Sequence, residues 1–264
     1  MTDIILNGAC GRMGRAIAEA SASADVRIVA GVDPFGRSGG TPLAFPLYAS
    51  LDEVTECADV LIDFTVHTST PDLIRFAERT GTPMVIATTG HTPEELEALH
   101  GLSASCAILH SGNMSLGVHL LISLCRQASA VLGGKADIEI IEKHHNQKLD
   151  APSGTALMIA HAIREALPEE TEVIYDRTDR RSVRPRNEIG ISAIRGGNIV
   201  GEHEVLFCCG DEIVSIKHTA IGRSLFAQGA LRAAEFLKGK QSGLFTMEDL
   251  LREALEKPAA KVNV

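Results

Sequence analysis

The sequence predicts an α/β protein with an N-terminal doubly wound, Rossmann-like domain and a separate α+β domain that holds an open mixed sheet. Short apolar runs alternate with helical patterns over residues 3–110, which is typical of successive βα units around a parallel sheet. A glycine-rich turn follows the first run, and beyond residue 190 strand patterns succeed one another with only short turns between them. A chain of 264 residues is long enough for two domains, which we expect at 1–113 with 223–264 and at 114–222.

The first domain is expected to contain five strands, at residues 4–6, 26–32, 60–64, 84–88 and 106–109. Helix boundaries between them are indicated by a capping-box pair, by proline in a first helical turn and by terminal glycines, at Ser50 with Glu53, Thr70-Pro71, Thr92-Pro93, Gly81 and Gly101. These signals predict a doubly wound sheet.

The second domain begins with an expected helix at 115–132, a strand at 137–142 and a helix from Ser153. Residues 176–187 carry five arginines without periodicity, which indicates an exposed, mobile loop. Strands are then expected at 190–194, 199–209 and 212–220, mostly antiparallel, because Gly196-Gly197-Asn198 and Gly210-Asp211 have hairpin turn chemistry. One face of such a four-stranded sheet would lack cover, which favours a homo-oligomer.

The C-terminal part returns to helix at 224–238 and 247–255, the second capped by Thr246 with Asp249. We expect these helices to cover the first sheet.

Composition narrows the classes of function. The net charge of -9 disfavours binding to nucleic acid or to an anionic membrane surface, and favours a small-molecule partner. No apolar run is long enough to span a bilayer, and the first residues lack the pattern of a signal peptide, so a cytoplasmic location is expected. The six cysteines show no C-x-x-C spacing, which predicts neither disulfides nor a zinc site.

The turn after the first strand predicts a bound dinucleotide. Glycines at 8, 11 and 14 would let the backbone approach a pyrophosphate at a helix N-terminus, although the same pattern also occurs in tight turns that bind nothing. Asp33 ends the second apolar run 19 residues after Gly14, where a carboxylate would meet a ribose hydroxyl. It would repel a 2′-phosphate, so NADH is at least tolerated, whereas Arg12 or Arg37 could accept NADPH.

Two further strand ends fall where an open α/β sheet binds its ligand. They carry Ala87-Thr88-Thr89-Gly90 and Ser111-Gly112-Asn113-Met114, whose small and hydroxyl residues suit close approach. The same residues also cap helices and shape turns.

The polar loop from Glu142 to Ala156 is the richest group of chemical residues. His144 and His145 titrate near neutral pH, Lys148 is a cation, and Ser153-Gly154-Thr155 begins a helix whose free N–H groups could hold a carboxylate. These residues suit an anionic substrate that receives a proton. A shared metal is disfavoured because the histidines are adjacent, and a serine nucleophile is disfavoured because no G-x-S-x-G is present.

That loop, E-K-H-H-N-Q-K-L-D-A-P-S-G-T-A, resembles the signature of bacterial 4-hydroxy-tetrahydrodipicolinate reductases, also called dihydrodipicolinate reductases. The resemblance spans nearly the whole chain through further motifs: G-A-C-G-R-M-G at 8–14, Asp63-Phe64-Thr65, Ala87 to Gly90, Asn113 to Val118, Arg195 to Gly197, Gly201 to His203 and Ser242 to Phe245.

The resemblance implies an oxidoreductase of lysine and diaminopimelate biosynthesis that reduces a cyclic imine dicarboxylate to tetrahydrodipicolinate with NADH or NADPH. It implies that His144 is the acid/base residue, that Lys148 is a second proton donor, and that His145, Gly154 and Thr155 hold a substrate carboxylate. It implies a homotetramer formed through the sheet of the second domain. It also implies a cofactor site lined by Gly8, Ala9, Cys10, Gly11, Arg12, Met13, Asp33, Ala87, Thr88, Thr89, Ser111, Gly112, Asn113 and Met114.

The chain departs from the family pattern at three places. Cys10 stands where relatives often have glycine, and Pro34 where they often have a basic residue, which weakens an NADPH-specific interpretation. His67 falls where a proline-containing sequence is common, and either approaches the nicotinamide or lies simply on the surface. A different two-domain dehydrogenase and a dinucleotide-sensing regulator are the alternatives, and neither would need the His-His-x-x-Lys loop.

Overall fold

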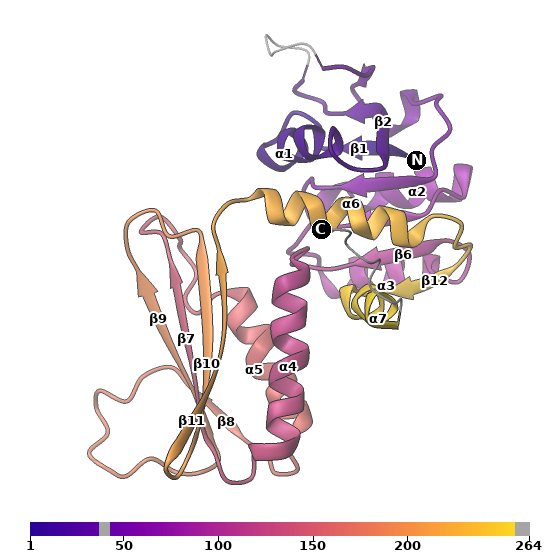
Figure 1. The fold of residues 1–264 in the computed structure, drawn as a ribbon. Coiled ribbons are helices and arrows are strands. Elements are labelled where there is room, and N and C mark those ends of the chain that lie inside the picture. The colour runs from indigo at the N-terminus through magenta and orange to yellow at the C-terminus, as the bar shows by residue number, and fades with distance from the viewer. Residues whose placement is uncertain (37–42, 257–264) are drawn as a thin grey trace, which may run out of the picture. The chain divides into compact units, whose positions relative to one another are not determined.

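A computed structural model describes residues 1–36 and 43–256 of the chain, which divides into two compact units (Figure 1). The first unit comprises residues 1–116 and 223–264, and the second comprises residues 117–222. Within the described ranges, no helix is both long enough and apolar enough to cross a membrane. Arg37 lies outside the described residues.

The first unit is built on a seven-stranded, wholly parallel sheet. Its spatial order is β12-β6-β5-β4-β1-β2-β3, with bounds β1 Thr2–Asn7, β2 Val26–Val32, β3 Leu47–Tyr48, β4 Val60–Asp63, β5 Met84–Ile86, β6 Ala107–His110 and β12 Gly243–Phe245. The five expected strands are all present, with ends shifted by up to two residues. Parallel strands place their carboxyl ends at one edge of the sheet, which is where the predicted cofactor residues follow them.

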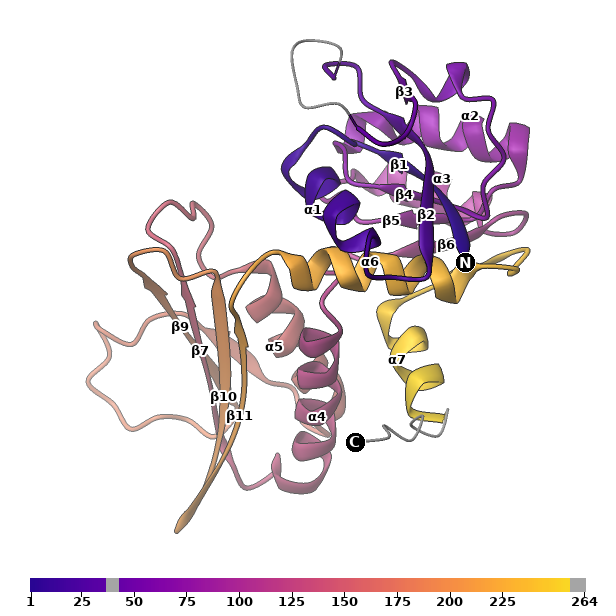
Figure 2. The ribbon, with the colours of Figure 1, turned by 45° about the horizontal axis from the view of Figure 1, so that its top comes forward.

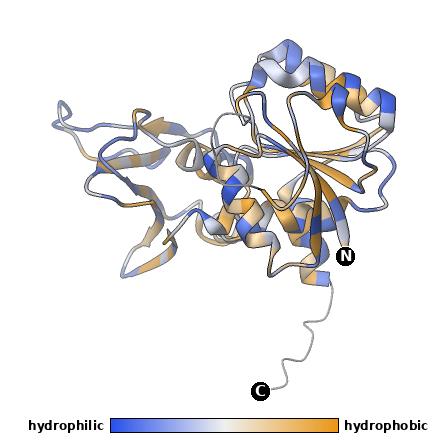
Figure 3. Cartoon of the chain, turned by 90° about the horizontal axis from the view of Figure 1, so that it is seen from above, coloured by the Kyte–Doolittle hydropathy of each residue, from blue (hydrophilic) through white to orange (hydrophobic). Residues whose placement is uncertain are grey.

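Helices cover both faces of this sheet (Figure 2). They are α1 Arg12–Ser21, α2 Thr70–Thr80, α3 Pro93–Leu102, α6 Ser224–Leu237 and α7 Met247–Glu256, with short 3-10 turns at Leu51–Glu53 and His67–Ser69. Alternate strand residues enter two cores: Ile4 and Leu6 pack with α1, α6 and α7, whereas Ile5 and Leu61 pack with α2 and α3. The strands are therefore hydrophobic along their length (Figure 3).

The helix-boundary signals were accurate at some positions and wrong at others. Pro93 lies in the first turn of α3 as predicted, and Gly81 ends α2 in the left-handed conformation. Thr92 also forms a capping box with Glu95, which was not predicted. Ser50 makes no side-chain cap, because only a single 3-10 turn follows it. Gly101 lies inside α3, which ends one residue later.

The second unit packs two helices against one face of a five-stranded sheet (Figure 1). Its elements are α4 Leu116–Leu132, β7 Asp137–His144, α5 Gly154–Ala166, β8 Glu172–Ile174, β9 Glu188–Arg195, β10 Gly201–Cys209 and β11 Glu212–Ala220. The spatial order is β11-β10-β7-β9-β8, so an additional short strand, β8, extends the expected four. The sheet is mixed: β7 pairs parallel with β9 and antiparallel with β10.

The expected hairpin at Gly196-Gly197-Asn198 is wrong. Strands β9 and β10 do not pair with each other, because β7 lies between them. The glycine turn instead crosses the end of β7, where the Gly196 N–H donates to the His144 carbonyl oxygen and the Asn146 N–H donates to that of Gly197. The hairpin at Gly210-Asp211 does form, between β10 and β11. The sheet is thus evenly mixed rather than mostly antiparallel.

The arginine-rich segment at 176–187 is tied to the sheet. Arg177 and Arg184 pair with Glu139, and Arg180 pairs with Glu188. Most residues of the segment are exposed, as the sequence predicted. The ion pairs with Glu139 were not predicted, because that carboxylate lies on a strand distant in sequence.

Candidate active site

The glycine turn between β1 and α1 brings backbone to the sheet edge. Gly8 has φ of 85°, and a Cβ there would lie 2.7 Å from the Phe64 carbonyl oxygen. A Cβ on Gly14 would lie 2.2 Å from the Gly8 carbonyl oxygen, so α1 packs directly on the turn. Gly11 is the N-cap of α1, and among the described residues no side chain caps this helix or adds an acidic group to its first turn. The turn and its uncapped N–H groups therefore fit the pyrophosphate of a dinucleotide.

Asp33 lies at the end of β2, beside that turn. Its side chain is buried, and one carboxylate oxygen accepts the Cys10 N–H at 2.9 Å while the other accepts the Phe35 N–H at 3.0 Å. Each oxygen keeps lone-pair capacity for a ribose hydroxyl. The exposed Arg12 begins α1.

A buried carboxylate, Asp63, holds the strand ends together. It accepts hydrogen bonds from Asn7 Nδ2 at 2.8 Å, Thr65 Oγ1 at 2.7 Å and Thr88 Oγ1 at 2.6 Å. Burial raises the pKa of Asp63, although these hydrogen bonds act in the opposite direction. The Thr88 hydroxyl thus faces inward, and the buried Ala87 packs in the core, so both could reach a cofactor only through the backbone.

The remaining cofactor candidates vary in exposure. Thr89 and Gly112 are exposed, whereas Ser111 is buried and its hydroxyl donates to the Asn113 carbonyl oxygen. Met114 is 2% exposed and belongs to the core, so only its backbone could contact a ligand. Cys10 and Met13 are partly buried, and Ala9 is fully buried.

His144 is the last residue of β7 and is nearly buried. Its Nδ1 lies 2.6 Å from Glu142 Oε2, and its ring meets that of His203 edge to face at 5.2 Å. Burial lowers the pKa of His144, while Glu142 acts to raise it and Lys148 and Arg195 act to lower it. Strand β7 runs two residues beyond its expected end, so His144 is held on a strand rather than in the loop.

The other predicted substrate residues follow within the same unit. Lys148 pairs with Asp150 at 2.8 Å, and His145 is partly buried. Ser153 caps α5, since its Oγ accepts the Ala156 N–H at 3.2 Å. Gly154 and Thr155 form the first turn of that helix, and no acidic residue lies there.

Three residues near His144 were missed as members of the site: Glu142, Arg195 and His203. Glu142 and His144 are two apart on a strand and so share a face, which the sequence could have indicated. Arg195 and His203 join through the pairing of β9 and β10 with β7, which a single sequence does not reveal.

His67 is held by a contact with Glu95. Its Nδ1 lies 3.0 Å from Glu95 Oε2, and its side chain is 39% exposed. Among the described residues, no three His, Cys, Asp or Glu side chains are grouped so that they could hold a metal ion.

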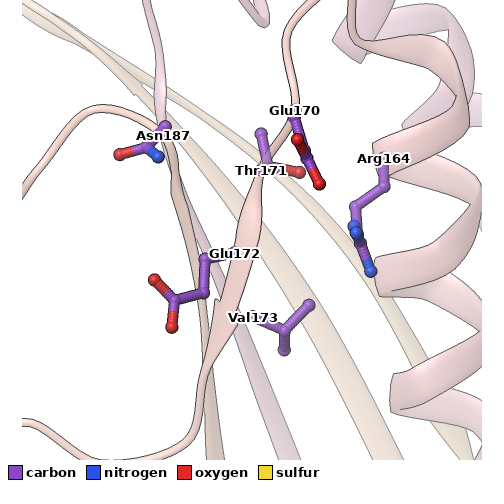
Figure 4. A pocket seen from close by; sticks show the side chains of 6 residues that line it. All are labelled: Arg164, Glu170, Thr171, Glu172, Val173 and Asn187. Carbon is purple, nitrogen blue, oxygen red and sulfur yellow. The ribbon is translucent and has the colours of Figure 1, made fainter.

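A cavity of about 350 Å³ elsewhere in the second unit contains none of the predicted residues (Figure 4). It is lined by Arg164, Glu170, Thr171, Glu172, Val173 and Asn187. It therefore does not belong to the histidine site.

Comparison with known proteins identifies the family of this chain. A family model described as "Dihydrodipicolinate reductase, N-terminus" matches residues 2–114, and one described as "Dihydrodipicolinate reductase, C-terminus" matches residues 117–251. The chain belongs to the dihydrodipicolinate reductase family. The 4-hydroxy-tetrahydrodipicolinate reductase of Caldanaerobacter subterraneus subsp. tengcongensis is 49% identical over 96% of this chain and 99% of its own length. That of Clostridium novyi is 42% identical over 96% of this chain and 99% of its own length.

Solved structures agree on the fold of this dihydrodipicolinate reductase family member. A dipicolinate-bound dihydrodipicolinate reductase from Paenisporosarcina sp. TG-14 has a TM-score of 0.78 at 23% identity, covering 93% of this chain and 97% of that one. An amine dehydrogenase from Mycobacterium smegmatis has a TM-score of 0.61 at 11% identity, covering 94% and 95%.

The family assignment confirms the predicted α/β fold and the predicted reductase of lysine and diaminopimelate biosynthesis that uses a nicotinamide cofactor. It decides against a different dehydrogenase and against a non-enzymatic regulator.

Proposed function

We propose that this chain reduces the cyclic imine derived from 4-hydroxy-tetrahydrodipicolinate to tetrahydrodipicolinate, with His144 as the acid that protonates the substrate. The observation that carries this proposal is the buried contact of 2.6 Å between His144 Nδ1 and Glu142. A carboxylate that accepts from Nδ1 leaves Nε2 as the atom that exchanges a proton with a ligand.

The substrate carboxylates are assigned to the start of α5 and the loop before it. Ser153 caps the helix, and its first turn, which begins with Gly154 and Thr155, holds no acidic residue, so the positive end of the helix dipole would attract a carboxylate there. Lys148 would add a positive charge and His145 a hydrogen-bond donor, which help to hold the two negative charges of the substrate.

The chemistry requires one hydride and one proton. The reduced nicotinamide, when bound, supplies the hydride. Addition of a hydride to the conjugated imine leaves an enamine-like carbanion on the substrate, which His144 Nε2–H protonates, with Lys148 as a second donor. Burial lowers the pKa of His144 in the free protein, and the negative charge of a bound dicarboxylate would raise it again and so favour the protonated acid.

The first unit is proposed as the dinucleotide-binding domain and the second as the substrate-binding and oligomerisation domain. Asp33 and Pro34 favour use of NADH, and Arg12 would allow binding of NADPH by contacting its 2′-phosphate. No metal is proposed to take part. The proposed assembly is a homotetramer, and the proposed location is the cytoplasm, where the six free cysteines would stay reduced.

The proposal is tested by measuring NADH oxidation with synthase-derived substrate in the unmodified protein and in variants. His144→Ala should lower kcat by about 10²- to 10⁴-fold, the usual contribution of a general acid. Lys148→Ala should lower kcat and raise KM. Lys143→Ala is the matched control, because Lys143 lies on the opposite face of β7 and pairs with Glu202. This variant should retain activity. Unchanged kcat in both His144→Ala and Lys148→Ala would contradict the catalytic assignment.

A further inference from the structure

Four polar side chains meet on the helix-covered face of the second sheet. Glu142 and His144 are two residues apart on β7 and therefore lie on the same face of the sheet. Arg195 lies opposite His144 on β9, and His203 lies opposite Glu142 on β10. Side chains paired in this way across neighbouring strands share a face, and this face also meets Ser153 at the start of α5. The sheet thus brings together residues from three strands.

Glu142 lies at the centre of this group and is 0% exposed. Its Oε1 accepts from Arg195 NH2 at 2.7 Å and from the Ser153 N–H at 3.0 Å, and its Oε2 accepts from Arg195 NH1 at 2.8 Å in addition to His144 Nδ1. Burial acts to raise the pKa of Glu142, but hydrogen bonds from Arg195 and His144 outweigh it and leave that pKa below its ordinary value. Glu142 is therefore an ionised carboxylate whose lone pairs are all directed at donors.

We propose that Glu142 and Arg195 are positioning residues that hold His144 with its proton on Nδ1, so that Nε2 gives up and regains the catalytic proton. This inference rests on the proposed role of His144. A carboxylate can only accept, so the nitrogen it contacts must carry hydrogen, and the tautomer is fixed by the contact. The Nε2 edge lies over Gly201, where a Cβ would come within 3.2 Å of it, so glycine leaves this edge of the ring uncrowded.

The two members of the pair act on His144 in opposite directions. Glu142 stabilises the imidazolium, whereas Arg195, which neutralises Glu142 through two hydrogen bonds, destabilises it. The other charged or titratable groups around the ring are Lys148 and Asp150 from the following loop, and His203 on β10 with His218 opposite it on β11. The direction in which the pKa of His144 changes can therefore be predicted for removal of either residue.

The deciding measurement is the pH profile of kcat/KM in the full chain. Glu142→Gln should move the alkaline limb to lower pH by about one unit and lower kcat by about a hundredfold, because the acid loses its stabilising carboxylate. Arg195→Gln should move the same limb to higher pH. The dissociation constant for pyridine-2,6-dicarboxylate should change less than kcat in both variants, because neither residue is assigned to the ligand. Glu142→Asp, which keeps the charge, should restore part of kcat.

A matched control lies on the other face of the same strand. Glu139 also binds an arginine through two hydrogen bonds, from Arg177 at 2.9 and 3.1 Å, and accepts a third from Arg184 at 3.0 Å. Among the described residues, no histidine contact accompanies them. Glu139→Gln should leave the alkaline limb where it is in the unmodified protein. A shift equal to that of Glu142→Gln would show that loss of any sheet carboxylate produces the effect, and would overturn the proposal.

A double variant separates this inference from the proposed function. If Glu142 acts through His144, then Glu142→Gln in a His144→Ala background should lower kcat no further. An additional loss of tenfold or more would overturn the positioning role while leaving the function intact. A His144→Ala variant with normal kcat would overturn the function itself. If Glu142→Gln does not fold, Arg195→Gln carries the test, and an alkaline limb that stays or moves to lower pH would contradict the proposal.

Discussion

At Asp33, a single carboxylate shapes the glycine turn at the end of β2, where the sequence predicts contact with a ribose. It is bound to the Cys10 and Phe35 N–H groups, which fix its orientation without neutralising its charge. A 2′-phosphate would therefore meet an uncompensated negative charge from this side chain.

We predict that Asp33→Asn lowers the ratio of the NADPH to the NADH dissociation constant by about tenfold, equivalent to about 1.4 kcal/mol. The amide keeps the shape of the side chain but removes the repulsion. Titration of both nucleotides measures the ratio, which cancels any general loss of affinity caused by a disturbed turn. Asp52→Asn, at an exposed position of the same unit, is the control. A ratio that stays constant in Asp33→Asn would refute the role of the charge.

His203 predicts a pH dependence of stability. Burial lowers the pKa of His203 to about 4, and its Nδ1 is buried without a hydrogen-bond partner among the described residues. The unfolded chain therefore binds this proton near pH 6.5 and the folded chain only near pH 4, so stability is lost as the pH falls through this interval. The loss should reach about 3 kcal/mol at its limit. Urea unfolding at pH 7 and pH 4 should show a smaller decline for His203→Gln, and equal declines would contradict the assignment.

Candidate residues that lie close together in the chain could be named from the sequence, and those that strand pairing brings together could not. The glycine turn and the His144 loop are each contained in a short segment, so residue spacing was sufficient. Glu142 and Arg195 are 53 residues apart and meet only because β9 pairs with β7. The hydrogen bond from the Thr88 hydroxyl to Asp63 also joins neighbouring strands and was not predicted.

At the scale of elements, the strands missed from the sequence are all very short, although the equally short β5 was predicted from its longer apolar run at 84–88. Strands β3, β8 and β12 have only two or three residues, too few for alternation to be recognised. Turn chemistry correctly predicted that the chain reverses direction after β9. It did not predict which strand β10 pairs with, because β7 lies between β9 and β10 and pairs with both.

Helix α6 constrains one of the proposed cofactor turns through Gly229. A Cβ on Gly229 would lie 1.7 Å from the Met114 carbonyl oxygen, so the helix backbone rests on the turn after β6. Gly229→Ala should lower the free energy of unfolding by about 1–3 kcal/mol through overpacking. Gly101→Ala, inside α3 with nothing within 4 Å of the added Cβ, should instead raise it by about 0.5–1 kcal/mol. Urea unfolding compares the two, and equal effects would contradict the packing argument.

At the scale of the whole molecule, no helix among the described residues packs on the second face of the second sheet. Glu139, Ile141 and Lys143 on β7 alternate with the residues that pack on α4 and α5, and Ile213 on β11 is 65% exposed. The same face carries positive and negative side chains, such as Lys143 and Lys217, which both pair with Glu202. A surface with apolar groups and both charges can complement a second copy of itself, which supports the proposed tetramer.

An arginine in place of Ile213 should weaken that assembly by more than tenfold, because the contact would have to bury an unpaired charge. Sedimentation velocity over a concentration series should give a four-chain mass for the unmodified protein and smaller species for Ile213→Arg. Val131→Arg is the control, since Val131 is 82% exposed on α4 in the same unit but away from the sheet face. A one-chain mass for the unmodified protein would exclude the proposed assembly. Dissociation by Val131→Arg alone would place the interface elsewhere. Retention of four chains by Ile213→Arg would exclude this end of β11 from the contact.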